Sequence, residues 1–343
     1  MAWYNGDIKD NYHVMWSRVR IYRNIQGMEF SPIWDHKKAV TVMNKAAMLL
    51  EKNGFHHSDE CTPEGYIKYA EIGYADRGFV ECEGDRALYM NEPCNLAIAL
   101  GGEDFICISS ILPSFAIGEA YRDANEAELL LDSELDFAYE ENIGYVSPAP
   151  SRIGHGVLFS VNLFLPALSG LSEIKKVIKK ASLQGYNMHP LTTYEENSGG
   201  FYVIEYAPDI YTNINDAESK LSDFVKYVIS LEKEYESNIF GDNSALLNKA
   251  WRSVGIMEYG STLTEAEMLS LISNIRLTHC LGCSDKLPYC IDIASLNTLQ
   301  TELMNTYIYS EINADDVSKE SCDKERARRL NEYIKALRMR EVV

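Results

Sequence analysis

A pair of neighbouring carboxylates opens the segment from 101 to 120, GGEDFICISSILPSFAIGEA. Glu103 and Asp104 stand at the start of an alternating run, so one carboxylate can point into a cleft while Phe105 and Ile108 pack. A carboxylate in that position can hold a cationic group and accept a proton from it. The alternative is ordinary turn chemistry, because acidic residues beside Gly-Gly commonly end a hairpin.

Two arginines in the N-terminal part of the chain carry the opposite charge. Arg18 and Arg20 are two residues apart in WSRVRIYRN, a spacing that turns both side chains to one side of a strand. Guanidinium groups gathered in this way bind phosphate oxygens. Without further context, a salt-bridged pair on the surface of a strand is the simpler interpretation.

The elements that must position these groups alternate between strand and helix patterns. Residues 87–111 give three strand signals separated by turns, and apolar runs at 156–165 and 200–206 predict further strands. Apolar residues recur at helical spacing in 35–53 and in 114–139. Strands joined by short turns, with helices between groups of strands, predict an α+β fold in which helices flank an antiparallel sheet.

A polar loop separates this part of the chain from an all-helical part. Residues 216–238 have the pattern of a long amphipathic helix, and the loop FGDNSA at 240–245 follows it. Beyond the loop the pattern is nearly all helical as far as the C-terminus. We therefore expect a sheet-bearing domain at 1–240 and a smaller helical domain at 241–343.

Charge and composition argue against several classes of protein. The 343 residues are 46% hydrophobic, enough for a sizeable core. The formal net charge of −19 repels a phosphate backbone and no useful basic patch offsets it, so we expect no nucleic-acid partner. The N-terminus lacks a signal-peptide pattern, and the sequence has no uncharged apolar run of membrane-spanning length. These features predict a cytoplasmic protein with no membrane partner.

The cysteines raise the question of a metal. Eight of them in this chain are too sparse for a secreted disulfide scaffold. His279, Cys280, Cys283 and Cys290 together have the ligand types of a zinc site. Because adjacent His279 and Cys280 do not easily converge on one ion, and a second C-x-x-C is absent, we expect buried thiols and no bound metal.

Five segments give the sequence a resemblance to a known family. They are WSRVRIYRN at 16–24, the acidic segment at 101–120, IGYVSPAPSRIGHGVLFSVNLFLPAL at 143–168, GGFYVIEYA at 199–207 and NKAWRSVGIMEYG at 248–260. In their order and spacing the chain resembles the ATP:guanido phosphotransferases, and among them the bacterial protein-arginine kinases, along almost its full length. The resemblance implies the guanido kinase catalytic fold.

The resemblance also implies a chemistry. Such enzymes move the γ-phosphoryl group of ATP, with Mg²⁺, onto a guanidinium, and they need arginines on the phosphates and carboxylates on the guanidinium. Arg18 and Arg20 stand at two of the arginine positions, and Glu103 matches a carboxylate expected to contact the guanidinium. The second carboxylate falls in a shortened loop, where either Glu195 or Glu196 can stand in for it. Solvated loop acids are the alternative.

The remaining phosphate arginines that the resemblance leads us to expect are absent. Cys107, Leu158 and His189 stand at their positions, and Ala149 stands where the family has a cysteine. Arg152, which the family pattern lacks, is the first candidate for replacing lost phosphate ligands, and His155 and His189 are others. The site is therefore expected to be degenerate unless these residues restore it.

A short motif near the C-terminus adds a binding hypothesis. In the protein-arginine kinases an Arg-Asp-x-x-Arg-Ala motif binds phosphoarginine, and the matching stretch here is CDKERA at 322–327. Asp323 and Arg326 lie three residues apart on one helical face, so they can grip a guanidinium and a phosphate. Cys322 replaces the first arginine of the motif. The alternative is an ion pair on a solvated helix.

The expected loss of reaction rate favours one of three functions. Losing one preorganised charge-stabilising group typically costs on the order of 100 to 1,000-fold in rate. The resemblance therefore implies a degenerate kinase, or pseudokinase, that regulates an active arginine kinase or a Clp-type protease system. The alternatives are an active ATP-dependent protein-arginine kinase acting on arginine-containing protein substrates, and a phosphoarginine-binding module. The implied cofactors are ATP and Mg²⁺ where the site still works, and the implied assembly is a homodimer.

Overall fold

The computed structural model describes residues 3–5, 12–31, 33–58, 62–192, 199–239, 243–312 and 318–341. The chain forms two compact units that interleave along the sequence. Unit 1 comprises Met1–Trp3, Trp16–Val161 and Glu205–Asp223, and unit 2 comprises Tyr4–Met15, Asn162–Ile204 and Phe224–Val343. The boundary predicted from the sequence at residue 240 falls on residues outside the described ranges and stays a prediction.

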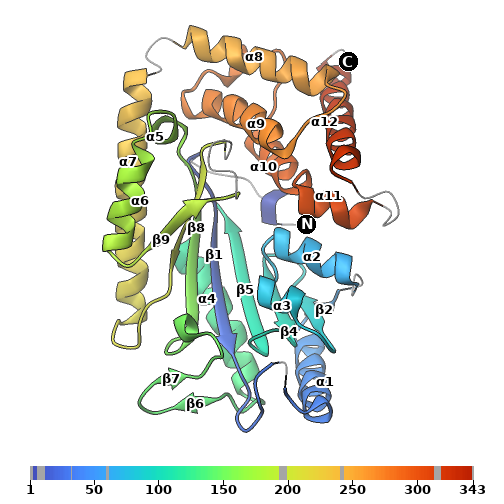
Figure 1. The fold of residues 1–343 in the computed structure, drawn as a ribbon, viewed down its shortest axis with the longest axis vertical. Coiled ribbons are helices and arrows are strands. Elements are labelled where there is room, and N and C mark those ends of the chain that lie inside the picture. Colours follow the sequence, from blue (N-terminus) through green and yellow to red (C-terminus); the bar gives the residue numbers. More distant parts are fainter. Residues whose placement is uncertain are drawn as a thin grey trace. The chain divides into compact units, whose positions relative to one another are not determined.

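An eight-stranded sheet is the central element, with the strand order β2-β3-β4-β5-β1-β8-β10-β9. Figure 1 shows the long strands β5, β1 and β8 side by side. In chain order the strands are β1 (Val14–Arg23), β2 (His56–His57), β3 (Ala87–Met90), β4 (Leu96–Leu100), β5 (Ile106–Pro113), β8 (Val157–Phe164), β9 (Asn187–Pro190) and β10 (Phe201–Tyr206). A separate two-stranded sheet pairs β6 (Tyr139–Glu140) with β7 (Gly144–Tyr145).

The antiparallel register of β1 and β5 arranges the candidate site residues. Arg20 lies opposite Ser109, and Tyr22 lies opposite Cys107. Because side chains alternate along a strand, Arg18 shares this face with Arg20 and Tyr22. The prediction that the two arginines point to one side of a strand is confirmed.

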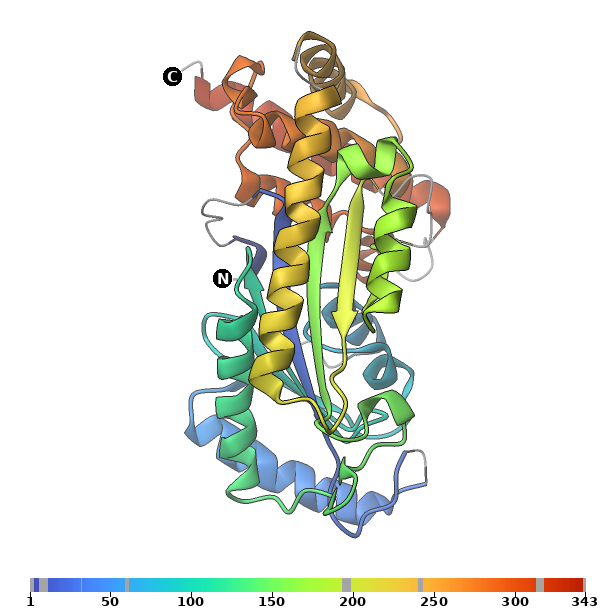
Figure 2. The same cartoon turned by 90° about the vertical axis from the view of Figure 1, so that its left-hand side faces the viewer.

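The helices of unit 1 are α1 (His36–Lys52), α2 (Pro63–Glu71), α3 (Arg77–Glu81), η2 (Pro150–Arg152) and α4 (Ile117–Asp132), and α7 (Ile214–Ile239) begins in this unit. Helices α1, α2 and α3 begin at polar caps, and α1 and α4 pack against strands of the sheet. Asp35 caps α1 by accepting from the backbone amides of Lys37 and Lys38, as its acidic start predicts. Figure 2 shows α4, which packs on β5, as a long helix along the sheet.

The end of α4 differs from the prediction of a helix as far as residue 139. The helix stops at Asp132, and the chain that follows pairs with the segment after β1. Ala138 donates its amide to the carbonyl of Asn24, and Gln26 donates to the carbonyl of Asp136. These tertiary bonds satisfy the backbone of 136–138 and override its helical pattern.

Unit 2 is largely helical. Its helices are α5 (Pro166–Gly170), α6 (Ile174–Leu183), the later part of α7, α8 (Ser244–Tyr259), α9 (Glu265–Cys280), η4 (Ser284–Lys286), α10 (Ile293–Glu302), α11 (Asn305–Glu311) and α12 (Lys319–Glu341). Helix α8 packs on α9 and on α12, and α6 packs beside β9 (Figures 1 and 2). The predicted α+β fold with a helical C-terminal part is confirmed.

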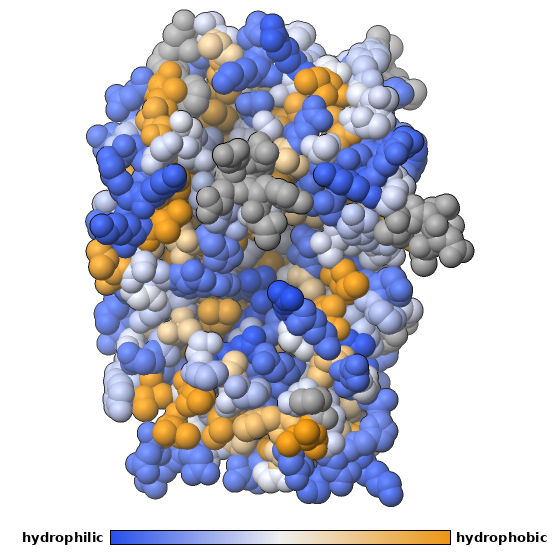
Figure 3. All heavy atoms as spheres, viewed as in Figure 1, coloured by the Kyte–Doolittle hydropathy of each residue, from blue (hydrophilic) through white to orange (hydrophobic). Residues whose placement is uncertain are grey.

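Much of the surface in Figure 3 is hydrophilic, as the many charged residues of the sequence predict. Hydrophilic side chains dominate the face drawn in Figure 3, with apolar side chains in small groups between them. Within the described ranges, no helix is both long enough and apolar enough to cross a membrane.

Candidate active site

Arg152 is the centre of an ion-pair cluster in unit 1. Its Nη1 lies 2.6 Å from Asp104 Oδ2 and 3.2 Å from Glu103 Oε2. Its Nη2 lies 3.2 Å from Asp76 Oδ2. The guanidinium also lies over the ring of Tyr22, 4.1 Å from the ring centroid. Three carboxylates and one aromatic ring therefore bind a single guanidinium.

The turn between β4 and β5 presents two of these carboxylates. Gly101 begins the turn at a φ of +91°, and a Cβ atom there would lie 2.3 Å from the carbonyl oxygen of Asp85, so only glycine fits. The amide of Gly101 donates to the carbonyl of Phe105 across the turn at 2.8 Å. This tight connection fixes Glu103 and Asp104 at the start of β5.

Asp104 is the buried member of the pair. Its Oδ1 accepts from Asn24 Nδ2 and from Ser147 Oγ, each at 2.7 Å, while its Oδ2 accepts from Arg152. Both oxygens are thus satisfied in a side chain that is 1% exposed. Glu103, which the resemblance matches to a catalytic carboxylate, is by contrast 46% exposed. Asp104 therefore anchors the cluster, and Glu103 lies at its edge.

Asp76 joins the cluster from the start of α3. Its Oδ1 caps the helix by accepting from the amide of Phe79 at 2.9 Å, which leaves Oδ2 for Arg152. An aspartate just before a short helical pattern is a cap signal that the sequence offers. Nothing local in the sequence connects this cap with Arg152, because the two residues are 76 positions apart.

Cys107 supplies no positive charge at its position. The thiol is buried, and burial followed by the charge of Asp76 raises its pKa to about 12. Burial, followed by Cys107, also raises the pKa of the Tyr22 phenol beside it. Both groups are therefore neutral near pH 7, where an arginine would carry a full charge.

The two remaining arginines differ in their partners. Arg20 Nη2 donates to the carbonyls of Gly73 and Ala75, at 3.3 and 2.5 Å. Arg18 Nη2 lies 4.0 Å from Glu205 Oε1, and burial followed by the charge of Arg20 lowers the Arg18 pKa to about 9. The Nε atoms of both arginines are buried without a hydrogen-bond partner. Each of these two arginines therefore keeps one N–H donor in the interior that the described part of the chain does not use.

Acidic and basic side chains of unit 1 gather around the ion pairs of Arg152 and Arg18. The charged members are three guanidinium groups and four carboxylates: Arg18, Arg20, Arg152, Asp76, Glu103, Asp104 and Glu205. The described part of unit 1 gathers an excess of negative charge at these residues.

The other predicted site residues lie elsewhere or outside the described ranges. His189 belongs to β9 in unit 2, and its Nδ1 lies 2.9 Å from the carbonyl oxygen of Pro190. Glu195 and Glu196 lie outside the described residues. The structure thus brings Glu103, Arg152, Arg18 and Arg20 into unit 1, and the roles of all these residues stay predictions.

Asp323 and Arg326 form the predicted pair on α12, with Nη1 2.7 Å from Asp323 Oδ1. The i, i+3 ion pair of the alternative is therefore present, but its arginine is fully buried and not solvated. Its Nε donates to the carbonyl of Leu303 at 2.8 Å, its Nη1 also donates to Leu263 at 2.6 Å, and its Nη2 donates to Asn305. Every nitrogen of the guanidinium therefore has a partner within unit 2, and a phosphate would have to displace one of them.

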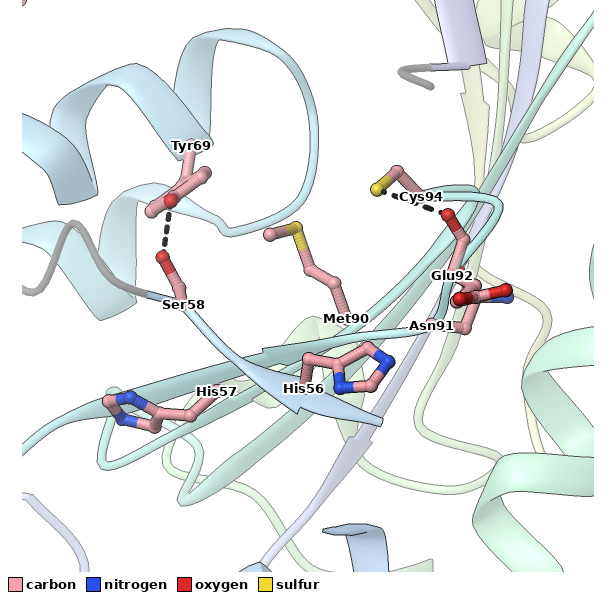
Figure 4. A pocket seen from close by; sticks show the side chains of 8 residues that line it. All are labelled: His56, His57, Ser58, Tyr69, Met90, Asn91, Glu92 and Cys94. Atoms are coloured by element: carbon pink, nitrogen blue, oxygen red, sulfur yellow. Dashed lines mark hydrogen bonds between the residues drawn. The ribbon is translucent and has the colours of Figure 1, made fainter. Parts of the chain in front are cut away.

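A separate open pocket of about 360 Å³ lies along β2 and β3 in unit 1. Figure 4 shows its lining: His56, His57, Ser58, Tyr69, Met90, Asn91, Glu92 and Cys94. His56 and His57 are exposed and belong to strand β2, where they lie opposite Met90 and Tyr89. Polar and apolar side chains line the pocket together, and the residues of the Arg152 ion-pair cluster are not among them.

Two sequence profiles match the chain. The ATP:guanido phosphotransferase C-terminal catalytic domain matches residues 35–235, and the protein-arginine kinase McsB C-terminal domain matches residues 243–342. The protein-arginine kinase of Clostridium acetobutylicum is 27% identical over 97% of this chain and 99% of its own length. The protein-arginine kinase of Bacillus cereus is 26% identical over 82% of each chain.

Solved structures share the fold at lower identity. The duplicated taurocyamine kinase from Schistosoma mansoni is 19% identical with a TM-score of 0.58, over 77% of this chain and 41% of that longer one. Lombricine kinase is 18% identical with a TM-score of 0.56, over 67% of this chain and 68% of its own. The resemblance inferred from the five segments is confirmed, and the chain belongs to the ATP:guanido phosphotransferase family as a relative of the protein-arginine kinases.

Proposed function

We propose that this chain is a protein-arginine-kinase-like member of the family in which a closed ion-pair cluster has replaced phosphoryl transfer, so that it acts as a pseudokinase with a regulatory or binding role. The observation that carries the proposal is the contact of Arg152 with Glu103. Glu103 matches the carboxylate expected on a substrate guanidinium, and a guanidinium of the chain itself already lies there.

The internal contact competes with both halves of the reaction. A substrate guanidinium must displace Arg152 from carboxylates that it already neutralises, at 2.6 Å in the case of Asp104. Arg152 in turn cannot serve as a phosphate ligand while its Nη atoms donate to Asp76, Glu103 and Asp104. Arg152, the residue that the sequence offers as a replacement phosphate ligand, is therefore held away from that role, which supports the proposal that phosphoryl transfer is lost.

The remaining groups support the same conclusion. The Cys107 thiol is neutral where the family has an arginine, and Leu158 and Ala149 carry no charge. Arg18 and Arg20 retain buried Nε donors, which suits a weak anion site. Mg-ATP, if bound, would be held by these two arginines, and it would supply the phosphoryl group of the family's reaction.

An active kinase is the second candidate, and one observation favours it. Glu103 is 46% exposed, and the side chain of Arg152 is 21% exposed, so movement of the 150–152 turn can uncover the carboxylate. In that case Arg152 leaves the acids and turns to the phosphates. The phosphoarginine-binding function has less support, because Arg326 is buried and fully engaged.

The partners follow from the relationship to protein-arginine kinases. We propose a protein partner in the cytoplasm: an active arginine kinase, a Clp-type protease system or an arginine-containing protein. A homodimer remains part of the proposal.

The experiment is an arginine-phosphorylation assay of an active protein-arginine kinase, with and without this chain. The proposal predicts no acid-labile label from this chain alone and a changed rate for the active enzyme when the chain is added in excess. Heat-denatured chain at the same concentration is the control, because it shows any effect of added protein that does not depend on the folded structure. Label from the chain alone at the rate of the active enzyme would favour the second candidate.

A further inference from the structure

Three segments of unit 2 bring an imidazole, a carboxylate and a thiol together. His13 directly precedes β1, Glu236 lies in the last turns of α7, and Cys280 ends α9. The ligand atoms of the three side chains all lie within 4.8 Å of one another. His13 and Glu236 are each only 3% exposed. Chemically different donors thus converge in the interior from distant parts of the sequence.

Glu236 has a buried oxygen that the protein does not use. Its Oε2 lies 3.1 Å from His13 Nε2, while its Oε1 is buried and has no hydrogen-bond partner. Leaving a carboxylate oxygen unsatisfied in the interior costs free energy, because the oxygen has lost its water. A bound cation would satisfy it.

Glu232, one helical turn earlier on α7, shows the contrast. Its Oε1 accepts from the amide of Ala167 at 2.6 Å, and its Oε2 accepts from the amide of Leu168 at 2.9 Å. Both oxygens of this fully buried carboxylate are therefore used by the start of α5. Of the two acids, Glu236 is the one with capacity for a ligand.

The nearby guanidinium of Arg276 does not donate a hydrogen bond to the unsatisfied oxygen of Glu236. Arg276 is buried and interacts electrostatically with Cys280. Its Nη2 donates to Asn297 Oδ1, and its Nη1 lies 3.4 Å from the carbonyl oxygen of Tyr12. Its hydrogen bonds are thus directed at groups other than Glu236.

The donor set selects one class of ion. Imidazole nitrogen, thiolate sulfur and one carboxylate oxygen suit Zn²⁺, whereas Mg²⁺ and Ca²⁺ take oxygen ligands. Ligand atoms around a tetrahedral zinc ion are about 3.3–3.8 Å apart, given bonds of about 2.0–2.3 Å. The observed separations, all within 4.8 Å, need only small side-chain movements to match.

We propose that His13, Glu236 and Cys280 bind one Zn²⁺ ion, which ties the start of β1 to α7 and α9. The fourth position of the tetrahedron is left for a water molecule. Binding converts the Cys280 thiol to a thiolate, and its proton passes to the solvent. His13 then carries its remaining proton on Nδ1.

This proposal replaces the expectation of no metal, and it differs from the ligand group considered in the sequence. The Nε2 of His279 lies 2.8 Å from the carbonyl oxygen of Ile291, and His279 is not one of the three proposed ligands. Cys280 is shared by both groups, but its partners come from 13 and 236 and not from the C-x-x-C pair. The competing explanation is a metal-free hydrogen bond between His13 and Glu236.

The test is metal binding by the purified full chain. After chelator treatment and removal of the chelator, Zn²⁺ is titrated in and the bound ion is counted by elemental analysis. Co²⁺ is then used as a spectroscopic probe, because a cysteine ligand gives a thiolate-to-Co²⁺ charge-transfer band. The proposal predicts one Zn²⁺ per chain, and a charge-transfer band of one thiolate.

Variants assign the ligands. Loss of a residue that only supports a metal ligand typically weakens metal binding about 10–100-fold. Cys280→Ser and His13→Gln each remove a ligand and should weaken Zn²⁺ binding by more than that. Cys280→Ser should also remove the charge-transfer band. Cys283→Ser, a buried cysteine in the same segment, is the matched control and should keep both. Absence of stoichiometric Zn²⁺ in the wild type, a Co²⁺ complex without the band, or unchanged binding in Cys280→Ser would each overturn the proposal. The wild-type measurements decide the question even where a variant fails to fold.

Discussion

Arg152 and Glu103 are 49 positions apart in the sequence, and the Nη1 of one lies 3.2 Å from the Oε2 of the other. The same Nη1 lies 2.6 Å from Asp104, so one nitrogen is shared by two acids. An arginine placed in this way neutralises the carboxylates and is itself neutralised. The contact therefore links the stability of unit 1 to the state of its candidate site.

Removing Arg152 should destabilise the protein. Arg152→Ala leaves Asp104 and Asp76 as buried charges without their counter-ion, which typically costs about 3 kcal/mol or more in the free energy of unfolding. Urea unfolding measures the loss. Arg77→Ala is the matched control, since Arg77 is 87% exposed and pairs with Glu81 on the surface. Equal losses in the two variants would show that the cluster contributes no stability.

The two neighbouring acids should respond differently to neutralisation. Asp104→Asn removes a charge that accepts from Asn24, Ser147 and Arg152, and it should cost about 2–3 kcal/mol in the free energy of unfolding. Glu103→Gln changes a side chain that is 46% exposed, so its melting temperature should stay close to that of the wild type. Thermal unfolding compares them. A larger loss in Glu103→Gln would contradict the assignment of Asp104 as the anchor.

Glu232 should give the stability a pH dependence. Burial raises its pKa to about 8, while the unfolded chain titrates near the ordinary value of 4.5. Between these values the folded state holds a proton that the unfolded state has lost, so the stabilisation is full below about pH 4.5 and is lost as the pH rises toward 8.

Glu232→Gln stays uncharged at every pH and should remove this contribution. The free energy of unfolding of the variant should decline less than that of the wild type between about pH 5 and pH 8. The measurement is urea unfolding at several pH values with a chelator present, so that metal binding does not contribute. Parallel profiles for the two proteins would show that Glu232 does not titrate in this range.

Arg326 should behave as a structural residue. Arg326→Ala breaks bonds to the carbonyls of Leu263 and Leu303 and to Asp323 in the interior, which typically costs about 3–5 kcal/mol. Arg328→Ala, on the exposed side of α12, is the comparison and should show no similar loss in chemical unfolding. If Arg326→Ala unfolds like the wild type but loses phosphoarginine binding, the binding hypothesis for this pair is favoured.

Much of the fold is predictable because it is encoded locally. Asp35 caps α1, and the apolar spacing of 216–238 gives the helical course of α7, so each element is specified by its own residues. The side shared by Arg18 and Arg20 follows from strand alternation alone. The end of α4 is not predictable in this way, because bonds from Asn24 and the chain after it decide where the helix stops.

The candidate site is predictable only in part. Family resemblance supplies Glu103 and the two arginines of β1, but the partners of Arg152 come from positions whose local patterns give no pairing information. Asp76, for example, is visible in the sequence only as a helix cap. The convergence of His13 and Glu236 spans 223 positions, and only the folded chain brings them together.

A single-turnover transfer experiment decides whether this chain transfers phosphoryl groups to arginine. The chain, in excess over γ-labelled Mg-ATP, is incubated with an arginine-rich protein and scored for acid-labile label, with an active protein-arginine kinase run in parallel to validate the substrate. We expect the wild type to give no more label than Glu103→Gln while the active enzyme labels the substrate. Acid-labile label that the wild type forms and Glu103→Gln does not would contradict this expectation, and would mean that Arg152 leaves the carboxylates during turnover.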